Sequence, residues 1–445
     1  MTDVVILGAS LAGLWTAAAA AGAGARVLVV ERDPESVGPT LRAGVPQGAQ
    51  PHVLLHRGVR AGERLLPGLR RHLLAAGAIS VDTGRLPWLG EYGWTPEQPS
   101  YEVLSLTRPL FERVVRDRVV ALPRIEVRWG ARVTGLGRDG AAWRVRVADG
   151  PDVTGSFVVD ATGRTSRLRR WLAELGVSTA APVTVDARLG YATQLIAGGP
   201  DPRDLPGVVL QATPQSPVGG TALPVEGRRW LVTAVGFGPH RPPRDRAGFE
   251  AFLQGLPDPA LAAILRSGQA VGEVAVHRQT ANQRQRYGRV PDWPDGLVAV
   301  GDALCCFDPI YGQGITVSAC QALRLRTVMA GGLRAGAARR LLRDFDRIIE
   351  FPWAVAIGQD VRMPTTDSRQ SWAQAAMQAW AAELWRRAVQ GDRRVHQVLL
   401  QTYHLESRPL AMVHPALIAS VARGRLMRTP LPAPRRPRVL DAMTA

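Results

Sequence analysis

The first residues that could do chemistry form a glycine-rich turn, Gly8-Ala9-Ser10-Leu11-Ala12-Gly13, which follows a short apolar run. Gly8 permits a tight turn out of a strand, and Gly13 lets a helix pack close to that strand. Ser10 stands where the dinucleotide fingerprint has its middle glycine, so its backbone and hydroxyl would face a pyrophosphate. The free N–H groups at the start of the following helix favour that anion.

An acid ends the next apolar run. Glu31 lies 23 residues after Gly8, and Arg32 follows it. A carboxylate at this place accepts hydrogen bonds from ribose hydroxyls and disfavours a 2′-phosphate. The pattern therefore predicts a bound dinucleotide and leaves FAD and NAD both open. Its expected contacts are Gly8, Ser10, Leu11, Ala12, Gly13, Glu31 and Arg32.

Two later motifs also follow apolar runs. The first is Asp160-Ala161-Thr162-Gly163-Arg164. The second is Gly301-Asp302, after which Pro309, Tyr311, Gly312, Gln313, Gly314 and Ile315 lead into a helical pattern. Both combine an acid with glycine immediately after a predicted buried strand, where a ligand of a parallel sheet binds.

The elements that must position these motifs are those of an α/β fold. The short apolar runs 4–7, 26–31, 157–160 and 297–300 predict buried parallel strands, and residues 11–23 predict a helix between the first two. Residues 183–273 alternate apolar and polar side chains over long stretches, which predicts an antiparallel sheet. Beyond Ala335 the pattern is helical.

These patterns predict a Rossmann-like dinucleotide-binding domain, an antiparallel-sheet substrate domain and a C-terminal helical region. We assign 1–180 and 275–335 to the first domain, 181–274 to the second and 336–428 to the helical region. Residues 80–105 would contribute to the substrate domain, and 429–445 would be a Pro/Arg-rich tail that is extended or disordered over 430–437. Residues 52–76 have helical spacing, which would place His52 and His56 on one helix.

A stripe on the C-terminal helices predicts core packing. It comprises Trp372, Met377, Trp380, Leu384 and Trp385.

Composition narrows the possible functions. The net charge is +17, yet all 55 basic residues are arginines scattered along the chain, so we expect no nucleic-acid partner. The absence of lysine excludes a Walker P-loop, a Schiff base and a lysine-assisted halogenation. The three cysteines have no metal-type spacing, and we expect neither a metal site nor a disulfide framework. No apolar run is long enough to span a membrane, no signal peptide is evident, and a cytoplasmic location is expected.

With these three motifs in order, the chain resembles the FAD-dependent monooxygenases of the para-hydroxybenzoate hydroxylase type. The resemblance runs from Val4 to about Leu325. The segments Gly44-Val45-Pro46-Gln47-Gly48 and His52-Val53-Leu54-Leu55 look like a bacterial natural-product branch of epoxidases and hydroxylases, related to squalene epoxidases and polyether epoxidases.

The resemblance implies roles around the flavin. Asp302 would bond a ribityl hydroxyl, and Gly301 would turn the chain before it. Pro309 would pack on the isoalloxazine, while Gly312, Gln313 and Gly314 would surround its pyrimidine, with Ile315 in the helix start that stabilises anionic reduced flavin. Asp160 and Gly163 match the family's acid–glycine motif. Arg108 and Arg42 match flavin-contacting arginines, and His52 would line the flavin pocket.

The implied reaction is oxygen transfer. NADH or NADPH would reduce FAD, directly or through a separate flavin reductase, and reduced flavin would capture O2 as a C4a-hydroperoxide. No catalytic side chain is required beyond the flavin. The substrate would be a small hydrophobic terpenoid, polyketide or aromatic compound. Its expected pocket residues are Trp88, Trp94, Tyr101, Trp230 and Phe237.

Three other functions share the fold or the cofactor. A flavin-dependent halogenase is disfavoured by the missing lysine. A geranylgeranyl-type prenyl reductase would saturate alkenes without consuming oxygen. A flavin-binding sensor module would bind FAD without oxidising NAD(P)H.

Overall fold

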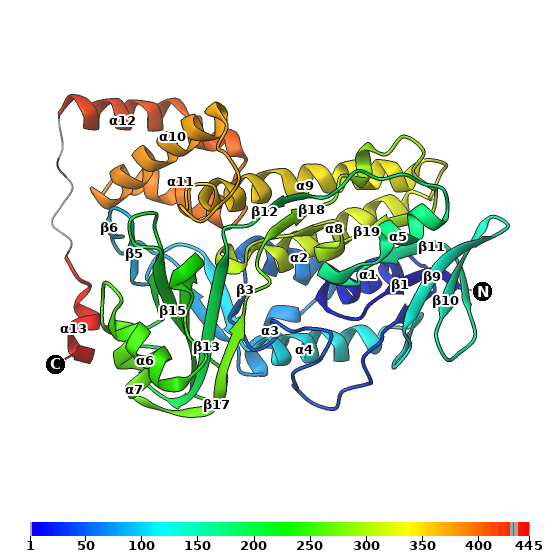
Figure 1. Cartoon of the computed structure of the whole chain (residues 1–445), viewed down its shortest axis with the longest axis horizontal. Helices are drawn as coiled ribbons and strands as arrows, with labels where there is room; N and C mark the ends of the chain where they lie inside the picture. The colour runs from blue at the N-terminus through cyan, green and yellow to red at the C-terminus, as the bar shows by residue number, and fades with distance from the viewer. Residues whose placement is uncertain (1, 428–429, 431–434, 445) are drawn as a thin grey trace.

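The computed structural model describes residues 2–427, 430 and 435–444, and its elements form an α/β fold with a C-terminal helical region (Figure 1). The first sheet has the order β8-β2-β1-β11-β10-β9, with β19 beside β11. Its strands are β1 (Thr2–Leu7), β2 (Val27–Val30), β8 (Ile125–Arg128), β9 (Val133–Asp139), β10 (Ala142–Val147), β11 (Val153–Asp160) and β19 (Leu297–Ala299).

The strands that carry the motifs run parallel. Leu7 at the end of β1 pairs with Asp160 at the end of β11, and Asp160 pairs with Ala299 at the end of β19. Residues 4–7 and 27–30 are buried throughout, as expected for strands covered on both faces. The register therefore brings the three motifs to one edge of the sheet.

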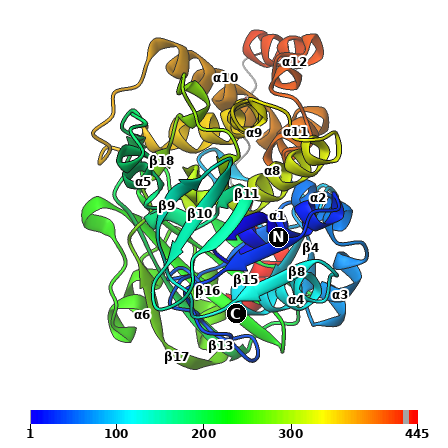
Figure 2. The same cartoon turned by 90° about the vertical axis from the view of Figure 1, so that its right-hand side faces the viewer.

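Helices cover this sheet in layers. Helix α1 packs on β1 and β2, α8 packs on α1, and α9 packs on α8 (Figures 1 and 2). The helices of this part are α1 (Leu11–Gly22), α2 (His56–Leu65), α3 (Leu69–Ala75), α4 (Arg108–Val120), α5 (Leu168–Glu174), α8 (Gln313–Ala330) and α9 (Ala337–Asp360).

A second seven-stranded sheet has the order β17-β13-β16-β15-β14-β5-β6 and is antiparallel except where β14 pairs with β5. Its strands are β5 (Trp88–Gly90), β6 (Gly93–Trp94), β13 (Leu189–Gly198), β14 (Val208–Leu210), β15 (Val218–Val225), β16 (Arg229–Phe237) and β17 (Gly268–His277). Helices α6 (Arg246–Gln254) and α7 (Ala260–Arg266) pack on one face of it.

Two three-stranded sheets lie beside these. One has the order β12-β18-β20 and the other β3-β7-β4. Their strands are β3 (His52–Leu54), β4 (Ile79–Asp82), β7 (Glu102–Leu106), β12 (Val183–Val185), β18 (Asn282–Arg284) and β20 (Cys305–Cys306). His52 therefore begins a strand while His56 begins α2, so the prediction of one helix over 52–76 was wrong.

The C-terminal helices are α10 (Trp372–Val389), α11 (Arg393–Tyr403) and α12 (Pro415–Leu426). The prediction of a packed stripe on α10 holds for Leu384, which is buried, but Trp372 and Met377 are 85% and 60% exposed. In the tail, α13 (Arg438–Thr444) packs on α7 and begins just after the segment 430–437 that is expected to be extended or disordered. Of the tail, residues 429, 431–434 and 445 lie outside the described residues.

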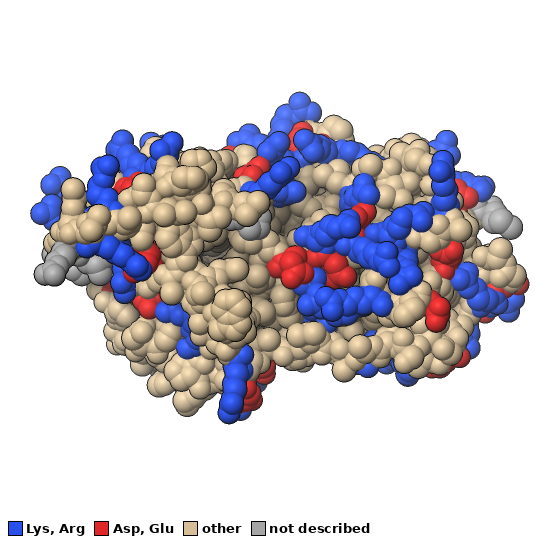
Figure 3. Space-filling view, turned by 90° about the horizontal axis from the view of Figure 1, so that it is seen from above, with Lys and Arg blue, Asp and Glu red and all other residues tan. Residues whose placement is uncertain are grey.

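Three features bear on partners. On the face shown in Figure 3, arginines lie in several separate groups with acidic side chains among them. Among the described residues, no helix is long and apolar enough to cross a membrane. The described residues also contain no cluster of His, Cys, Asp and Glu that could hold a metal ion.

A buried histidine joins the C-terminal region to the rest of the chain. His404 Nδ1 accepts a hydrogen bond from the His56 N–H at 3.2 Å, and its Nε2 lies 2.8 Å from Thr83 Oγ1. The Thr83 hydroxyl donates to Tyr101 O, so His404 Nε2 carries the proton. Burial, aided by His56, lowers the pKa of His404 to about 3.

This histidine gives a prediction for stability. Since its pKa in the unfolded chain is about 6.5, its stabilising contribution is present above that pH and is lost as pH falls toward 3. For each unit by which the pH falls, the free energy of unfolding of the wild type should decrease by about 1.4 kcal/mol relative to that of H404Q. Urea unfolding at about pH 7.5 and about pH 5 measures this. H240Q, at an exposed histidine, is the control and should follow the wild type.

Candidate functional site

An elongated cavity lies at the edge where β1, β11 and β19 end. Its walls come from the glycine-rich turn, the loop after β2, the segment after β11, the segment after β19 and the start of α8. The lining includes Ser10, Leu11, Ala12, Arg32, Gly44, Val45, Pro46, Gln47, His52, Arg108, Thr162, Gly163, Arg164, Gly301, Asp302, Pro309, Gly312, Gln313, Gly314 and Ile315. Most of the predicted cofactor contacts are thus brought together.

The glycine-rich turn is set by close backbone approach. Gly8 has φ +101°, and a Cβ on it would lie 2.7 Å from the backbone oxygen of Ala161. A Cβ on Gly13 would lie 1.9 Å from the Gly8 oxygen, so the start of α1 can follow the turn only with glycine there. The turn brings β1, α1 and the residues after β11 into direct contact.

Ser10 does not cap α1 with its side chain. Its hydroxyl donates to Glu112 Oε1 at 2.7 Å and accepts from Arg108 Nη2 at 2.9 Å. Burial disfavours the charge of Glu112, but Arg108 and the Ser10 hydroxyl outweigh this, and the pKa of Glu112 is lowered. Arg108 thus stands at the cavity wall, fixed by Glu112, with N–H groups suited to a phosphate.

Arg42 lies with the carboxylates behind the turn. Its guanidinium is 2.9 Å from Glu31 Oε2 and 3.3 Å from both Asp33 and Glu112, and it donates to Ala9 O. It does not line the cavity, so its expected place at the flavin ring is corrected. Glu31 also accepts from the Ala9 N–H at 2.6 Å, which ties the acid of β2 to the turn.

The acid and the glycine of the motif after β11 have different roles. Asp160 is fully buried and accepts hydrogen bonds from Thr162 and Ser166, so it holds the turn and does not line the cavity. Gly163 and Arg164 do line it. Arg164, which donates to Ala281 O at 2.7 Å, lines the cavity although its place in the sequence motif did not predict a role for it.

Asp302 and the start of α8 face the cavity from the third motif. Burial raises the pKa of Asp302, and Arg164 and Arg108 oppose that effect. Gly312 has φ +62°, and a Cβ on it would lie 2.6 Å from Val53 Cγ2. Helix α8 begins directly after it, so its free N–H groups point at the cavity.

His52 faces the same cavity from β3. Its Nδ1 donates to Gln50 O at 2.8 Å, which leaves Nε2 without a proton. Burial, with Arg108 adding to it, lowers the pKa of His52 to about 3, so the ring is neutral at physiological pH. His277, also in the wall, has its pKa lowered chiefly by burial. Its position was not expected from the sequence.

These residues fit FAD. At Gly8, Gly301 and Gly312 a Cβ would lie within 2.7 Å of another atom of the protein, so glycine is needed to form the turns that border the cavity. Arg108 and the starts of α1 and α8 supply donors for phosphate and for a negatively charged ring edge. Gln313 Oε1 is buried without a hydrogen-bond partner and can accept from a ligand. The cavity volume, its mouth included, is about 1400 Å³.

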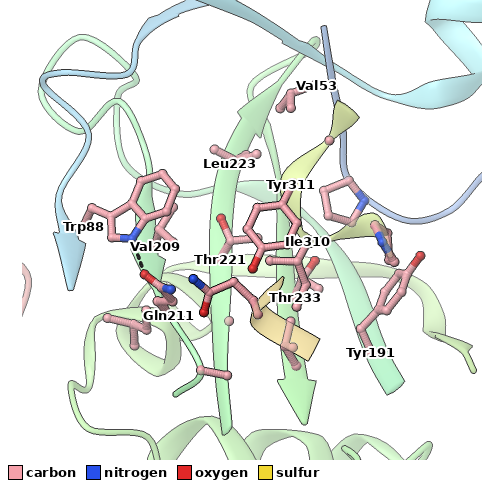
Figure 4. Close-up of a pocket in the computed structure, with 18 of the residues that line it drawn as sticks. Val53, Trp88, Tyr191, Val209, Gln211, Thr221, Leu223, Thr233, Ile310 and Tyr311 are labelled. Atoms are coloured by element: carbon pink, nitrogen blue, oxygen red, sulfur yellow. Dashed lines mark hydrogen bonds between the residues drawn. The ribbon is translucent and has the colours of Figure 1, made fainter. Parts of the chain in front are cut away.

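A second, mainly apolar cavity adjoins the first and has a volume of about 1290 Å³ with its mouth (Figure 4). The two share Pro51, Val53, Tyr191, Pro309 and Gly312. Side chains of the second sheet form one wall, among them Trp88, Val209, Gln211, Thr221, Leu223, Thr233 and Phe237. Trp88 Nε1 donates to Gln211 Oε1 at 3.3 Å.

Two of the five expected substrate residues, Trp88 and Phe237, line this cavity. Trp230 points to the opposite face of β16, where it packs above α6 and α7 and donates to Pro200 O. Trp94 packs against the same cluster. Tyr101 stacks between His56 and His404. The last three are therefore corrected to packing residues.

The wall opposite the sheet comes from the C-terminal region, which sequence reasoning did not connect with the substrate. It comprises Gln359, Asp360, Met363 and Tyr403. Tyr403 meets Trp88 edge-on, with ring centroids 5.8 Å apart. No local pattern in the sequence indicates that the end of α9 reaches the second sheet.

Comparisons with known proteins agree with this geometry. A family model described as FAD binding domain matches residues 1–350. Protein Rv3254 of Mycobacterium tuberculosis is 30% identical over 344 residues, 73% of this chain and 72% of that protein. The 6-methylpretetramide 4-monooxygenase of Streptomyces rimosus is 29% identical over 349 residues, 75% of this chain and 76% of that protein.

A solved structure shares the fold. The anhydrotetracycline hydroxylase OxyS of Streptomyces rimosus superposes with a TM-score of 0.60 at 21% identity, over 93% of this chain and 78% of that one. The mixed sheets, the cofactor cavity and the C-terminal helices described above thus form an architecture known from flavin-dependent hydroxylases.

Proposed function

Because this chain belongs to the FAD binding domain family, which includes flavin-dependent monooxygenases, we propose that it inserts one oxygen atom from O2 into a small hydrophobic substrate. The observation that carries the proposal is the shared wall between the two cavities. Pro309 and Gly312, where the family places the flavin ring, border both the glycine-lined cavity and the apolar one. A substrate in the apolar cavity would therefore lie next to the reactive end of the cofactor.

Bound FAD supplies the redox chemistry with O2 and with NADH or NADPH, either directly or through a flavin reductase. The chain's own residues bind the cofactor and orient it. Arg108 and the start of α1 hold the pyrophosphate, Asp302 bonds the ribityl chain, and the start of α8 stabilises negative charge on the ring. The apolar lining around Leu223 and Val209 keeps water from the site of oxygen transfer.

The size and lining of the apolar cavity support a terpenoid, polyketide or aromatic substrate, by epoxidation or hydroxylation. Its lining is mainly apolar, and Trp88, Tyr403 and Phe237 offer aromatic surface. Membership of the epoxidase branch remains a prediction.

The test begins with the purified protein. We expect a flavin absorption spectrum, oxidation of NADH or NADPH, and oxygen uptake that depends on added lipophilic alkenes or phenols. Turnover of an alkene without oxygen would overturn the proposal in favour of a prenyl reductase. Tight FAD without any NAD(P)H oxidation, even with a flavin reductase added, would favour a sensor module.

A further inference from the structure

Two buried carboxyl groups meet at the wall between the two cavities. Asp308 precedes Pro309 and lines the cofactor cavity, and Asp360 ends α9 and lines the apolar cavity. The two residues are 1% and 3% exposed. They come from segments 52 positions apart in the sequence, and neither has a part in the cofactor contacts described above.

Asn282 of β18 anchors the pair. Its Nδ2 donates to Asp360 Oδ2 at 2.6 Å, and its Oδ1 accepts from the Asp308 N–H at 2.7 Å. Asp308 Oδ1 accepts from the Ile310 N–H at 2.6 Å, whereas its Oδ2 is buried and receives no N–H or O–H donor. Asn282, which bonds both residues, thereby brings the Asp360 carboxyl beside that of Asp308, and the two carboxyls interact. Two carboxylates in such contact cannot both ionise, so the pair shares a proton.

The surrounding charges leave the pair without a strong counter-ion. Arg164 acts on Asp308 through space, while Asp186 adds repulsion at Asp360. Arg362 is engaged by Glu91 at 2.7 Å. Tyr311 and Tyr403 are the neighbouring titratable hydroxyls. No arginine is among the residues that line the apolar cavity in the described part of the chain. Burial and the second carboxyl raise the pKa of Asp360.

We propose that the Asp308–Asp360 pair, held by Asn282, is the polar recognition site of the apolar cavity, which binds a hydroxyl group of the substrate and rejects carboxylates. The inference rests on the proposed function of that cavity as the substrate pocket. With the shared proton held between the two carboxyls, the oxygens of the pair remain hydrogen-bond acceptors, which match the O–H donor of a hydroxyl group. A carboxylate ligand would meet a like charge in an apolar cavity without an arginine to pair with it.

The first experiment tests the shared proton through folding alone. A carboxyl with a raised pKa binds a proton in the folded chain but not in the unfolded one, so its stabilising effect is lost as pH rises above the ordinary carboxyl range. In D360N, the amide can donate to Asp308 without titrating. From about pH 5 to about pH 8, the unfolding constant of wild-type flavoprotein should rise about tenfold per pH unit relative to D360N.

A matched control is D367N, which changes a side chain that is 84% exposed. It should follow the wild type at every pH. Parallel curves for wild type and D360N would show that Asp360 carries no extra proton and would overturn the inference.

The second experiment tests recognition with three probes of one ring skeleton: 2-naphthol, 2-methoxynaphthalene and 2-naphthoate. Calorimetric titration of the wild-type flavoprotein should show at least about tenfold tighter binding of the naphthol than of either other probe. The double variant D308N/D360N, which removes the one negative charge of the pair, should narrow the difference between naphthol and naphthoate. Equal wild-type affinity for naphthol and naphthoate, or an unchanged ratio in D308N/D360N, would overturn the inference.

Neither experiment requires turnover. If oxygen uptake is absent while the pH curves and the probe affinities behave as stated, the proposed reaction fails and the recognition site stands. If substrate-linked oxygen uptake is found while the probes bind without discrimination, the reaction stands and the recognition site fails.

Discussion

Replacing Gly8 by valine should abolish flavin binding. Gly8 has φ +101°, a conformation that costs an L-residue roughly 1–3 kcal/mol, and a Cβ would lie 2.7 Å from backbone oxygen of Ala161. The Ala161 oxygen belongs to the backbone and cannot move aside as the end of a flexible side chain can. The end of β1 and the segment after β11 must therefore separate. That separation moves the turn, Ser10 and Gly163 away from the positions in which they line the cofactor cavity. The flavin absorbance of the purified variant, relative to protein absorbance at 280 nm, measures the loss.

Gly24 supplies a matched control for strain without a clash. It has φ +93°, and no atom lies within 4 Å of the place where its Cβ would be. G24V should therefore lose some stability and keep its flavin. A G8V protein that purifies with as much FAD as the wild type would contradict the assignment of this turn.

Replacing Arg42 by alanine should cost about 3–5 kcal/mol of folding free energy. The arginine side chain is 5% exposed and pairs with Glu31, Asp33 and Glu112, which are 6–8% exposed. Burial disfavours the charge of Arg42, but the three carboxylates more than compensate, and its pKa is raised. Without it, three buried carboxylates would lie close together, with Arg108 beside Glu112 and the half-exposed Arg32 4.0 Å from Asp33 as the remaining partners.

Denaturant unfolding of the purified protein measures this effect. R26A is the control, because Arg26 pairs with Asp3 at the surface, where the two side chains are 54% and 43% exposed. Such pairs contribute at most about 1 kcal/mol. If R42A were no less stable than R26A, the buried ion cluster would not be a structural support of the glycine-rich turn.

The glycine motifs could be predicted because their requirements are local. The positive φ of Gly8 and of Gly312 permits few other residues, and the position of each glycine in its motif records this directly in the sequence. The buried runs of β1 and β2 are equally local, since strands covered on both faces are apolar throughout.

The orientation of Trp230 could also have been predicted. Trp230 and Phe237 are an odd number of residues apart on β16, so they point to opposite faces of the sheet. Phe237 lines the apolar cavity and Trp230 packs above the helices. Counting positions along the strand would have shown that both could not line one pocket.

Other features depend on contacts that no local pattern records. The three residues of β3 form a strand because they pair with β7, about 50 positions later, which the helical spacing of 52–76 concealed. The carboxyl pair is similar: Asp360 belongs to the pocket only because α9 carries its last residue to Asp308 and Asn282. The exposure of Trp372 likewise depends on which part of α10 packs against other helices, and the sequence of α10 alone does not show this.

The central claim is that one atom of molecular oxygen enters the product. The most direct test is turnover under ¹⁸O2 with NADH or NADPH, followed by mass spectrometry of the product. The account predicts a product that carries one ¹⁸O atom, and no such label when ¹⁸O is supplied as water under ordinary O2. A product formed without O2, or one whose new oxygen comes from water, would contradict it.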